Sequence, residues 1–149
     1  MSSSVREQAE VFARSLIDTK FHHAARVPGV GIDCVGVIVL TGAHIGAWPA
    51  GFDVLPYPEV PTGMEMRTQC RQYLRRIHFK AMAPGDVVLL ISDRYPQHVG
   101  IVGRYRGTHH LSVIHACNAI ENPRVVETPL MFGAGFKFSE AYAFPEVAP

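Results

Sequence analysis

The chain has 149 residues, of which 48% are hydrophobic and 18% charged, and a formal net charge of +1 at pH 7. This length suits one domain with a proper hydrophobic core, so we expect residues 1–149 to form a single domain. The near-neutral charge argues against nucleic-acid binding, which requires clustered Lys and Arg. No stretch approaches the roughly 20 apolar residues of a membrane span. The N-terminus lacks the layout of a signal peptide, so we expect synthesis in the cytoplasm and another exit for any work outside.

Helical patterns occupy the first half of the chain. Ser4 and Glu7 have the spacing of a capping box, and apolar residues follow at helical intervals, which predicts a helix over residues 4–17. Residues 20–31 are expected to form a loop. A second helix is predicted to start at Asp33 and to end near the glycines of residues 42–46.

Residues 48–61 contain four prolines and are expected to cross the surface as an extended, irregular segment. Long ordered loops are commonly functional or flexible, and this one is a candidate wall of a substrate groove. Its aromatic residues are expected to anchor the segment itself. Thr62 and Glu65 form a second capping-box pattern, which predicts a third helix that ends before Met82. We interpret its basic cluster as a solvated helix face: Arg71, Arg75 and Arg76.

Short apolar runs separated by turns occupy the second half and predict strands. A turn at 83–86 precedes a continuous apolar run at 87–91, which a polar loop at 92–97 follows. Four further strands are expected, at 99–105, 111–117, 125–128 and 142–144. Helices first and strands afterwards predict an α+β domain, with N-terminal helices packed on a central antiparallel sheet of about five strands.

Three cysteines are present, Cys34, Cys70 and Cys117, and no CxxC pair occurs among them. This spacing argues against a zinc ribbon, a thioredoxin-type site and a disulfide framework. The simplest interpretation is one special thiol and two buried cysteines that pack as small hydrophobic residues. The paired histidines at 22–23 and 109–110 lack metal-ligand spacing, so no metal is expected.

Cys34 is the candidate nucleophile because of its place in the chain, where a loop rich in Gly and Pro meets an apolar run. Asp33 is a favourable N-cap residue, so Cys34 is expected in the first turn of a helix. The free N–H groups and the dipole of that terminus favour a thiolate, and they predict a lowered thiol pKa. On local chemistry alone, a buried helix cysteine is the more common alternative.

Two histidines of the strand-rich half are candidates for a base and its orienting partner. If strands 99–105 and 111–117 form a hairpin centred near residues 106–107, the numbers of facing residues sum to about 213. His98 and His115 meet this condition, and facing residues lie roughly 5 Å apart at Cβ. A thiol, a histidine base and a third polar group are what nucleophilic catalysis requires. The alternatives are a surface residue for His98 and a backbone-bonded core residue for His115.

Four motifs follow one another in order: Asp33-Cys34-Val35-Gly36, Pro84-Gly85-Asp86, His98-Val99-Gly100-Ile101 and Ile114-His115-Ala116. With them the chain resembles the NlpC-type papain-like cysteine peptidases of bacterial cell walls, over residues 19–130. It most resembles the short, single-domain group encoded with phage and prophage tail genes. The resemblance implies a papain-like NlpC-type fold that needs no metal or other cofactor. It also implies Cys34 as nucleophile, His98 as general base and His115 as orienting residue.

The resemblance also implies a substrate, because the family cleaves peptide stems of peptidoglycan, often between D-glutamate and a diamino acid. The expected partners are this peptide and phage tail proteins, and the expected place of action is the virion tail or the cell wall. Cys34 would attack the amide carbonyl and His98 would protonate the leaving amine, after which water would hydrolyse the thioester. The backbone N–H of Cys34 would help to hold the oxyanion.

Substrate-binding candidates surround the nucleophile, where the chain departs from the family pattern. Phe21 stands near a family Tyr and lacks its hydroxyl, and His23 is a candidate substitute. Asp33 is retained and is a candidate for binding a substrate amine, whereas Val35 replaces a common Ser. These departures leave open a catalytically weak or inactive tail-tip structural or binding module. Acyl transfer, or cleavage of an amide outside the wall, by the same Cys–His pair is a further alternative.

Overall fold

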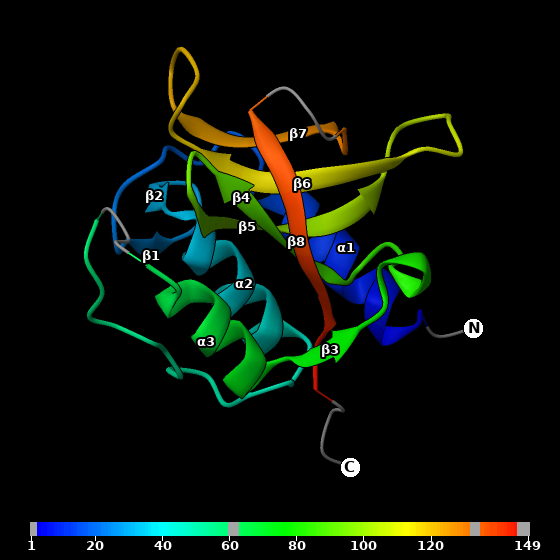
Figure 1. The fold of residues 1–149 in the computed structure, drawn as a ribbon, viewed down its shortest axis with the longest axis horizontal. Coiled ribbons are helices and arrows are strands. Elements are labelled where there is room, and N and C mark those ends of the chain that lie inside the picture. The colour runs from blue at the N-terminus through cyan, green and yellow to red at the C-terminus, as the bar shows by residue number, and fades with distance from the viewer. Residues whose placement is uncertain (1–2, 60–62, 132–134, 146–149) are drawn as a thin grey trace.

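The computed structural model describes residues 3–59, 63–131 and 135–145, and it has the α+β architecture that the sequence predicts. Six antiparallel strands form the main sheet (Figure 1). Their order in space is β3 (Arg75–Ile77), β8 (Phe136–Ala143), β4 (Val87–Ser92), β5 (Tyr95–Arg104), β6 (Leu111–Cys117) and β7 (Arg124–Pro129). None of the helices in the described ranges is long and apolar enough to span a membrane.

The three helices begin largely where the sequence predicts. In α1 (Val5–Ser15) the Ser4 hydroxyl accepts from the Glu7 N–H at 3.1 Å, and the Glu7 carboxylate accepts from the Ser4 N–H at 3.2 Å. These two bonds confirm the first capping box. α2 (Cys34–His44) has Asp33 as its N-cap. α3 (Glu65–Tyr73) starts without a side-chain cap, and Thr62 of the predicted second box lies outside the described residues.

The predicted length of the third helix was wrong. The backbone turns extended at Leu74 (φ −117°, ψ 163°), and β3 follows as an edge strand paired with β8. A short 3-10 helix, η1 (Phe79–Ala81), comes next. Strand formation at β3 depends on the backbone hydrogen bonds of β8, which comes about 65 residues later in the chain. Periodicity within residues 62–82 does not contain that information.

All five predicted strands overlap observed strands, two of them with one residue too many at the end (105 and 144), but the sheet is larger than predicted. β5 starts at Tyr95 instead of residue 99, and β8 starts at Phe136 instead of residue 142. Within the predicted loop at 20–31, β1 (Arg26–Val27) and β2 (Gly31–Ile32) form a separate two-stranded sheet. This small sheet leads directly into Cys34 and fixes the approach of the chain to α2.

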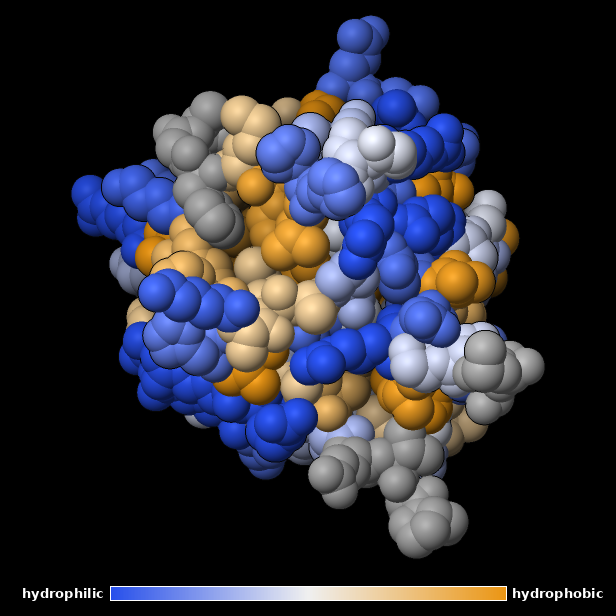
Figure 2. All heavy atoms as spheres, turned by 90° about the vertical axis from the view of Figure 1, so that its right-hand side faces the viewer, coloured by the Kyte–Doolittle hydropathy of each residue, from blue (hydrophilic) through white to orange (hydrophobic). Residues whose placement is uncertain are grey.

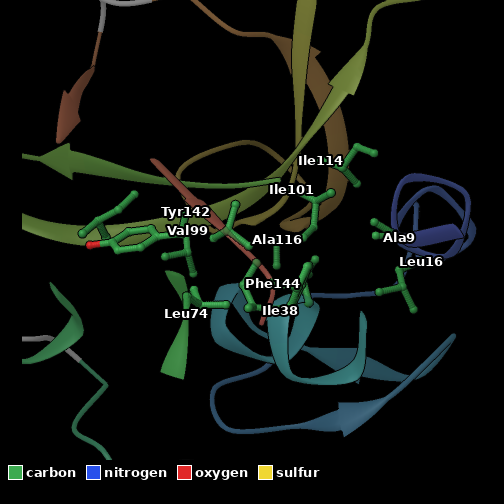
Figure 3. Packing of buried hydrophobic residues seen from close by; sticks show 14 of the residues in the cluster. Ala9, Leu16, Ile38, Leu74, Val99, Ile101, Ile114, Ala116, Tyr142 and Phe144 are labelled. Carbon is green, nitrogen blue, oxygen red and sulfur yellow. The ribbon is translucent and has the colours of Figure 1, made fainter. Parts of the chain in front are cut away.

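Alternation along the strands divides the buried side chains between two faces. One face packs against all three helices, and Figure 3 shows α1 and α2 side chains meeting those of the strands. Its strand residues include Val87, Leu89, Val99, Ile101 and Ile114. The opposite face holds a smaller cluster of Val88, Leu90, Val102 and Val113.

The smaller cluster has no α-helix over it among the described residues; partly buried side chains pack against it, including Met82, Phe136 and Phe138. Figure 2 views the molecule from the right-hand side of Figure 1, and hydrophobic side chains are exposed there among hydrophilic ones. Because side chains alternate along a strand, His98 and His115 belong to this second face.

Candidate active site

Cys34 is the first residue of α2, as predicted, and it is half-buried. Burial, and to a lesser degree the nearby Asp33 carboxylate, raise the pKa of its thiol to about 12. The backbone N–H groups of Val99, Val35 and Cys34 itself act in the opposite direction and favour the thiolate. The predicted lowering of this pKa was therefore wrong for the resting site. The prediction counted the helix terminus but not the burial around the sulfur.

The two histidines meet across β5 and β6. His98 Nε2 and His115 Nδ1 lie 2.6 Å apart, and the ring centroids are separated by 4.9 Å. Ile101 faces Ile114, so the numbers of facing residues sum to 215 (101 plus 114) and not to 213. The predicted register was wrong by two residues. A shift of two keeps every side chain on its face, so the histidines still touch, now diagonally.

Gly100 makes room for this contact. A Cβ atom built on Gly100 would lie 2.4 Å from Cγ2 of Val113 and 3.1 Å from Cβ of His115. Any larger residue would therefore push β6 and the His115 side chain away from β5. The glycine lets the two strands hold both imidazoles at hydrogen-bonding distance.

Further contacts orient both rings. His115 Nε2 lies 3.1 Å from the Thr128 hydroxyl of β7, so both nitrogens of this ring have partners. The ring of His98 stacks on Phe136 with centroids 4.8 Å apart and planes inclined by 14°. In the described part of the chain, Nδ1 of His98 has no hydrogen bond and is the nitrogen left for a thiol. Sequence reasoning missed Thr128, whose role depends on the β6–β7 register.

Both imidazoles are held neutral at pH 7. Burial, and to a lesser degree the neighbouring His115, lower the pKa of His98 to about 3. Burial lowers the pKa of His115 to about 4. Cys34 and His98 are neighbours through β5, because the Val99 N–H that acts on the thiol follows His98 directly. Within the described ranges, however, Cys34 Sγ makes no hydrogen bond with His98, so the resting pair is a neutral thiol beside a neutral imidazole.

Asp33 is only 3% exposed, and its carboxylate is fully occupied by the protein itself. Oδ1 accepts from the Gly36 N–H and from Arg26 Nη1, both at 2.8 Å. Oδ2 accepts from the Ala24 N–H at 2.8 Å and from the Tyr57 hydroxyl. Four donors fill the acceptor positions of a carboxylate. These four contacts give Asp33 a structural role, and the binding of a substrate amine by Asp33 stays a prediction.

Arg26 and Tyr57 complete a cluster that we call the Asp33 clamp, formed by Arg26, Asp33, Asp53 and Tyr57. Arg26 donates to both carboxylate oxygens of Asp53, at 2.9 and 3.2 Å, and to the Tyr57 hydroxyl at 2.8 Å. The clamp joins β1, the start of α2 and the proline-rich segment. Sequence reasoning expected Tyr57 to anchor its segment but missed Arg26, which no motif marked.

The other substrate-binding candidates have structural contacts. Phe21 packs at the edge of the main core, and its backbone bridges to Ile32. The ring of His23 meets the ring of Tyr57 edge-on, with centroids 5.4 Å apart. His23 therefore lies at the Asp33 clamp, and substrate binding by Phe21 or His23 stays a prediction.

The remaining cysteines and the basic cluster have no proposed catalytic role. Cys70 and Cys117 are buried, as predicted. Arg71, Arg75 and Arg76 are exposed to solvent, as predicted, but Arg75 and Arg76 lie in β3 and not in a helix. Arg71 and Arg76 also pair with the buried Glu140, at 2.5 and 3.2 Å. Among the described residues, no group of three or more His, Cys, Asp or Glu is placed to hold a metal ion.

Comparison with solved structures finds a similar fold in NlpC2 from Trichomonas vaginalis, with a TM-score of 0.65 and 17% sequence identity. The match covers 97% of this chain and 48% of that protein, so the chain spans about half the length of its structural neighbour. At this identity the likeness concerns the fold, and the chain has an NlpC-like α+β fold. No protein-family model and no curated protein matches the sequence.

Proposed function

We propose that this protein is a cysteine peptidase that hydrolyses peptide bonds in the peptide stems of peptidoglycan. One observation carries the proposal: His98, bonded to His115, directly precedes Val99, whose N–H acts on the thiol of the helix-start Cys34, in an NlpC-like fold. The Nε2–Nδ1 bond between the rings leaves Nδ1 of His98 for the thiol. This is the base-and-orienter arrangement that activates a cysteine.

In the proposed reaction, His98 takes the thiol proton as Cys34 Sγ attacks the amide carbonyl. The developing oxyanion is held by N–H groups at the start of α2, where those of Gly36 and Val37 are already taken by Asp33. The N–H groups of Cys34 and Val35 remain for this role. His98 then protonates the leaving amine, and a water activated by His98 hydrolyses the thioester. His115 stabilises the imidazolium that forms in each half-reaction.

The test is digestion of purified peptidoglycan, with released stem peptides measured by mass spectrometry. We expect the wild-type chain to release peptides, and Cys34→Ala and His98→Ala each to lower the rate at least about a hundredfold. His109→Ala is the matched control, because it removes an exposed histidine outside the site and should keep the activity. Equal peptide release by the Cys34→Ala protein would reject the proposal. We further propose, from the sequence resemblance, that the protein acts with phage tail proteins during entry through the wall.

The second candidate function is a non-catalytic binding module, and one observation favours it. Burial holds the Cys34 thiol protonated, and Cys34 Sγ makes no hydrogen bond to His98 within the described ranges. For a module of this kind, iodoacetamide would modify Cys34 slowly at neutral pH and equally in the His98→Ala protein. For the enzyme, His98→Ala would slow the modification.

A further inference from the structure

A cavity lies between α2, α3 and the first part of the proline-rich segment. Its lining includes Val99, whose N–H acts on the Cys34 thiol, and Cys70, which is close enough to Cys34 for the two thiols to interact electrostatically. Trp48 and Phe52 close it from the segment at 48–54. The cavity is therefore near the proposed point of attack, on the side of β5 that faces α2.

The lining of the cavity selects for apolar groups. Apart from Gln69 and the hydroxyl of Tyr73, every lining side chain is aliphatic, aromatic or sulfur-containing, and none carries a charge at neutral pH. A charged group that entered would lose its hydration without gaining an opposite charge. The space that a water-sized group can occupy is about 50 Å³. An apolar cavity that holds benzene measures about 150 Å³, so the room suits a short aliphatic chain and not an aromatic ring.

Gln69 supplies the polar contact. It lines this cavity and a second one that also contains Val35 and Tyr57. Its side-chain amide makes no hydrogen bond in the described part of the chain. An amide group can donate and accept at once, which matches the N–H and C=O of a peptide group.

We propose that this cavity is the subsite for a short aliphatic group next to the scissile bond, and that Gln69 binds the adjoining peptide group of the substrate. This inference rests on the proposed peptidase function, because it takes Cys34 as the point of attack. The substrate class is then a peptide with a small aliphatic residue, up to about the size of valine, beside the cleaved amide.

The test uses N-methyl-, N-propyl- and N-cyclohexylmaleimide, with modification of Cys34 followed by peptide mapping. Each rate is divided by the rate with glutathione, which removes differences in intrinsic reactivity. We expect the propyl reagent to react roughly tenfold faster than the methyl reagent, because each buried methylene contributes about a fourfold preference. The cyclohexyl reagent should gain nothing, because its ring is too large for the cavity.

Val54→Phe fills the cavity from the proline-rich segment and should remove the preference for propyl. Met66→Phe does the same from α3 and serves if the first variant fails to fold. Val30→Phe is the matched control, because Val30 is 70% exposed and outside the cavity. An unchanged preference in the folded filled variants, no preference in the wild type, or no reaction at Cys34 would each overturn the subsite.

The same proteins are assayed on purified peptidoglycan, which separates the two proposals. A propyl preference that Val54→Phe removes, without peptide release by any protein, supports the subsite and rejects the peptidase. Peptide release with no propyl preference supports the peptidase and rejects the subsite. Gln69→Leu should raise KM for a peptide substrate and leave the maleimide preference unchanged; an unchanged KM would reject the role of Gln69.

Discussion

Asp33 is central to the site as a structural residue, one position before the proposed nucleophile Cys34. It caps α2 through the Gly36 N–H and holds Arg26 and Tyr57 with its remaining oxygens. Its negative charge lies close enough to Cys34 to raise the thiol pKa. The Arg26 guanidinium, 2.8 Å from Oδ1, compensates that charge. Arg26 is therefore a positioning residue that also tunes the nucleophile through Asp33.

Arg26→Gln should slow the modification of Cys34 by iodoacetamide, because it leaves the Asp33 charge without its cation. An uncompensated Asp33 carboxylate next to Cys34 is expected to raise the thiol pKa by about one unit, which lowers the modification rate at pH 8 roughly tenfold. The ratio of the wild-type and Arg26→Gln modification rates, measured from pH 7 to 10, gives the shift in the thiol pKa, because the rate follows the thiolate fraction. Arg76→Gln removes an arginine from the distant Glu140 pair and should leave the profile unchanged. A wild-type profile for Arg26→Gln would contradict this account.

The buried histidines also make the fold sensitive to acid. The pKa values of His98 and His115 are lowered to about 3 and about 4 in the folded protein, against 6.5 for the ordinary side chain. Protonation therefore favours the unfolded chain. The stabilisation from the neutral rings is complete above pH 6.5 and is lost as the pH falls towards 4.

Between pH 7 and pH 5 we expect the free energy of unfolding to fall by about 2–4 kcal/mol, since each histidine contributes up to about 1.4 kcal/mol per pH unit below 6.5. Urea unfolding at several pH values measures this slope. His115→Asn should roughly halve the slope, whereas a substitution of the exposed His109 should not change it. A flat stability between pH 7 and pH 5 would show that the rings are not buried as described.

At the scale of elements, the β5–β6 hairpin determines whether the two histidines meet. Gly100→Ala places a methyl group 2.4 Å from Val113 and 3.0 Å from the Ile114 carbonyl oxygen. We expect the strands to separate there, with a loss of about 1–3 kcal/mol in stability and at least about tenfold in peptide release. Gly63→Ala is the control, because its Cβ would meet only ordinary contacts, at 3.5 Å from Glu65. Full activity of Gly100→Ala would argue against a strict need for the His98–His115 contact.

The elements show which parts of the fold a sequence can predict. α1 and the start of α2 depend on local signals, the capping box at Ser4 and the N-cap Asp33, and both were predicted correctly. β3 pairs with β8, which lies far from it in the sequence, and the sequence analysis missed β3 and most of β8. The hairpin was predicted with the right faces and the wrong register, because turn geometry sets the register and alternation sets only the faces.

The candidate site divides in the same way. Cys34, His98 and His115 carry recognisable chemistry in short motifs, so the sequence identified them as candidates. Arg26, Tyr57 and Thr128 act through contacts between distant segments, and nothing in their local sequence announces them. The thiol pKa was mispredicted for a related reason, because burial depends on the packing of the whole domain.

At the scale of the whole molecule, the sheet is the frame that brings the parts of the site together. α2 lies on one face and presents Cys34, while His98 and His115 come from β5 and β6. The clamp ties the proline-rich segment to the start of α2, which places the apolar cavity between that segment, α2 and α3. The NlpC-like fold thus supports the proposed roles of Cys34 as nucleophile and of His98 and His115 as base and partner.

The account depends most on Cys34 as the attacking group, and trapping of the acylated enzyme tests this directly. The intact protein is mixed with muropeptides, quenched in acid within seconds and analysed by mass spectrometry. We expect a mass increase equal to the acyl part of the cleaved peptide, mapped to Cys34 and absent in Cys34→Ala. Continued cleavage of the muropeptides by Cys34→Ala, with no adduct on Cys34 in the wild type, would contradict the account.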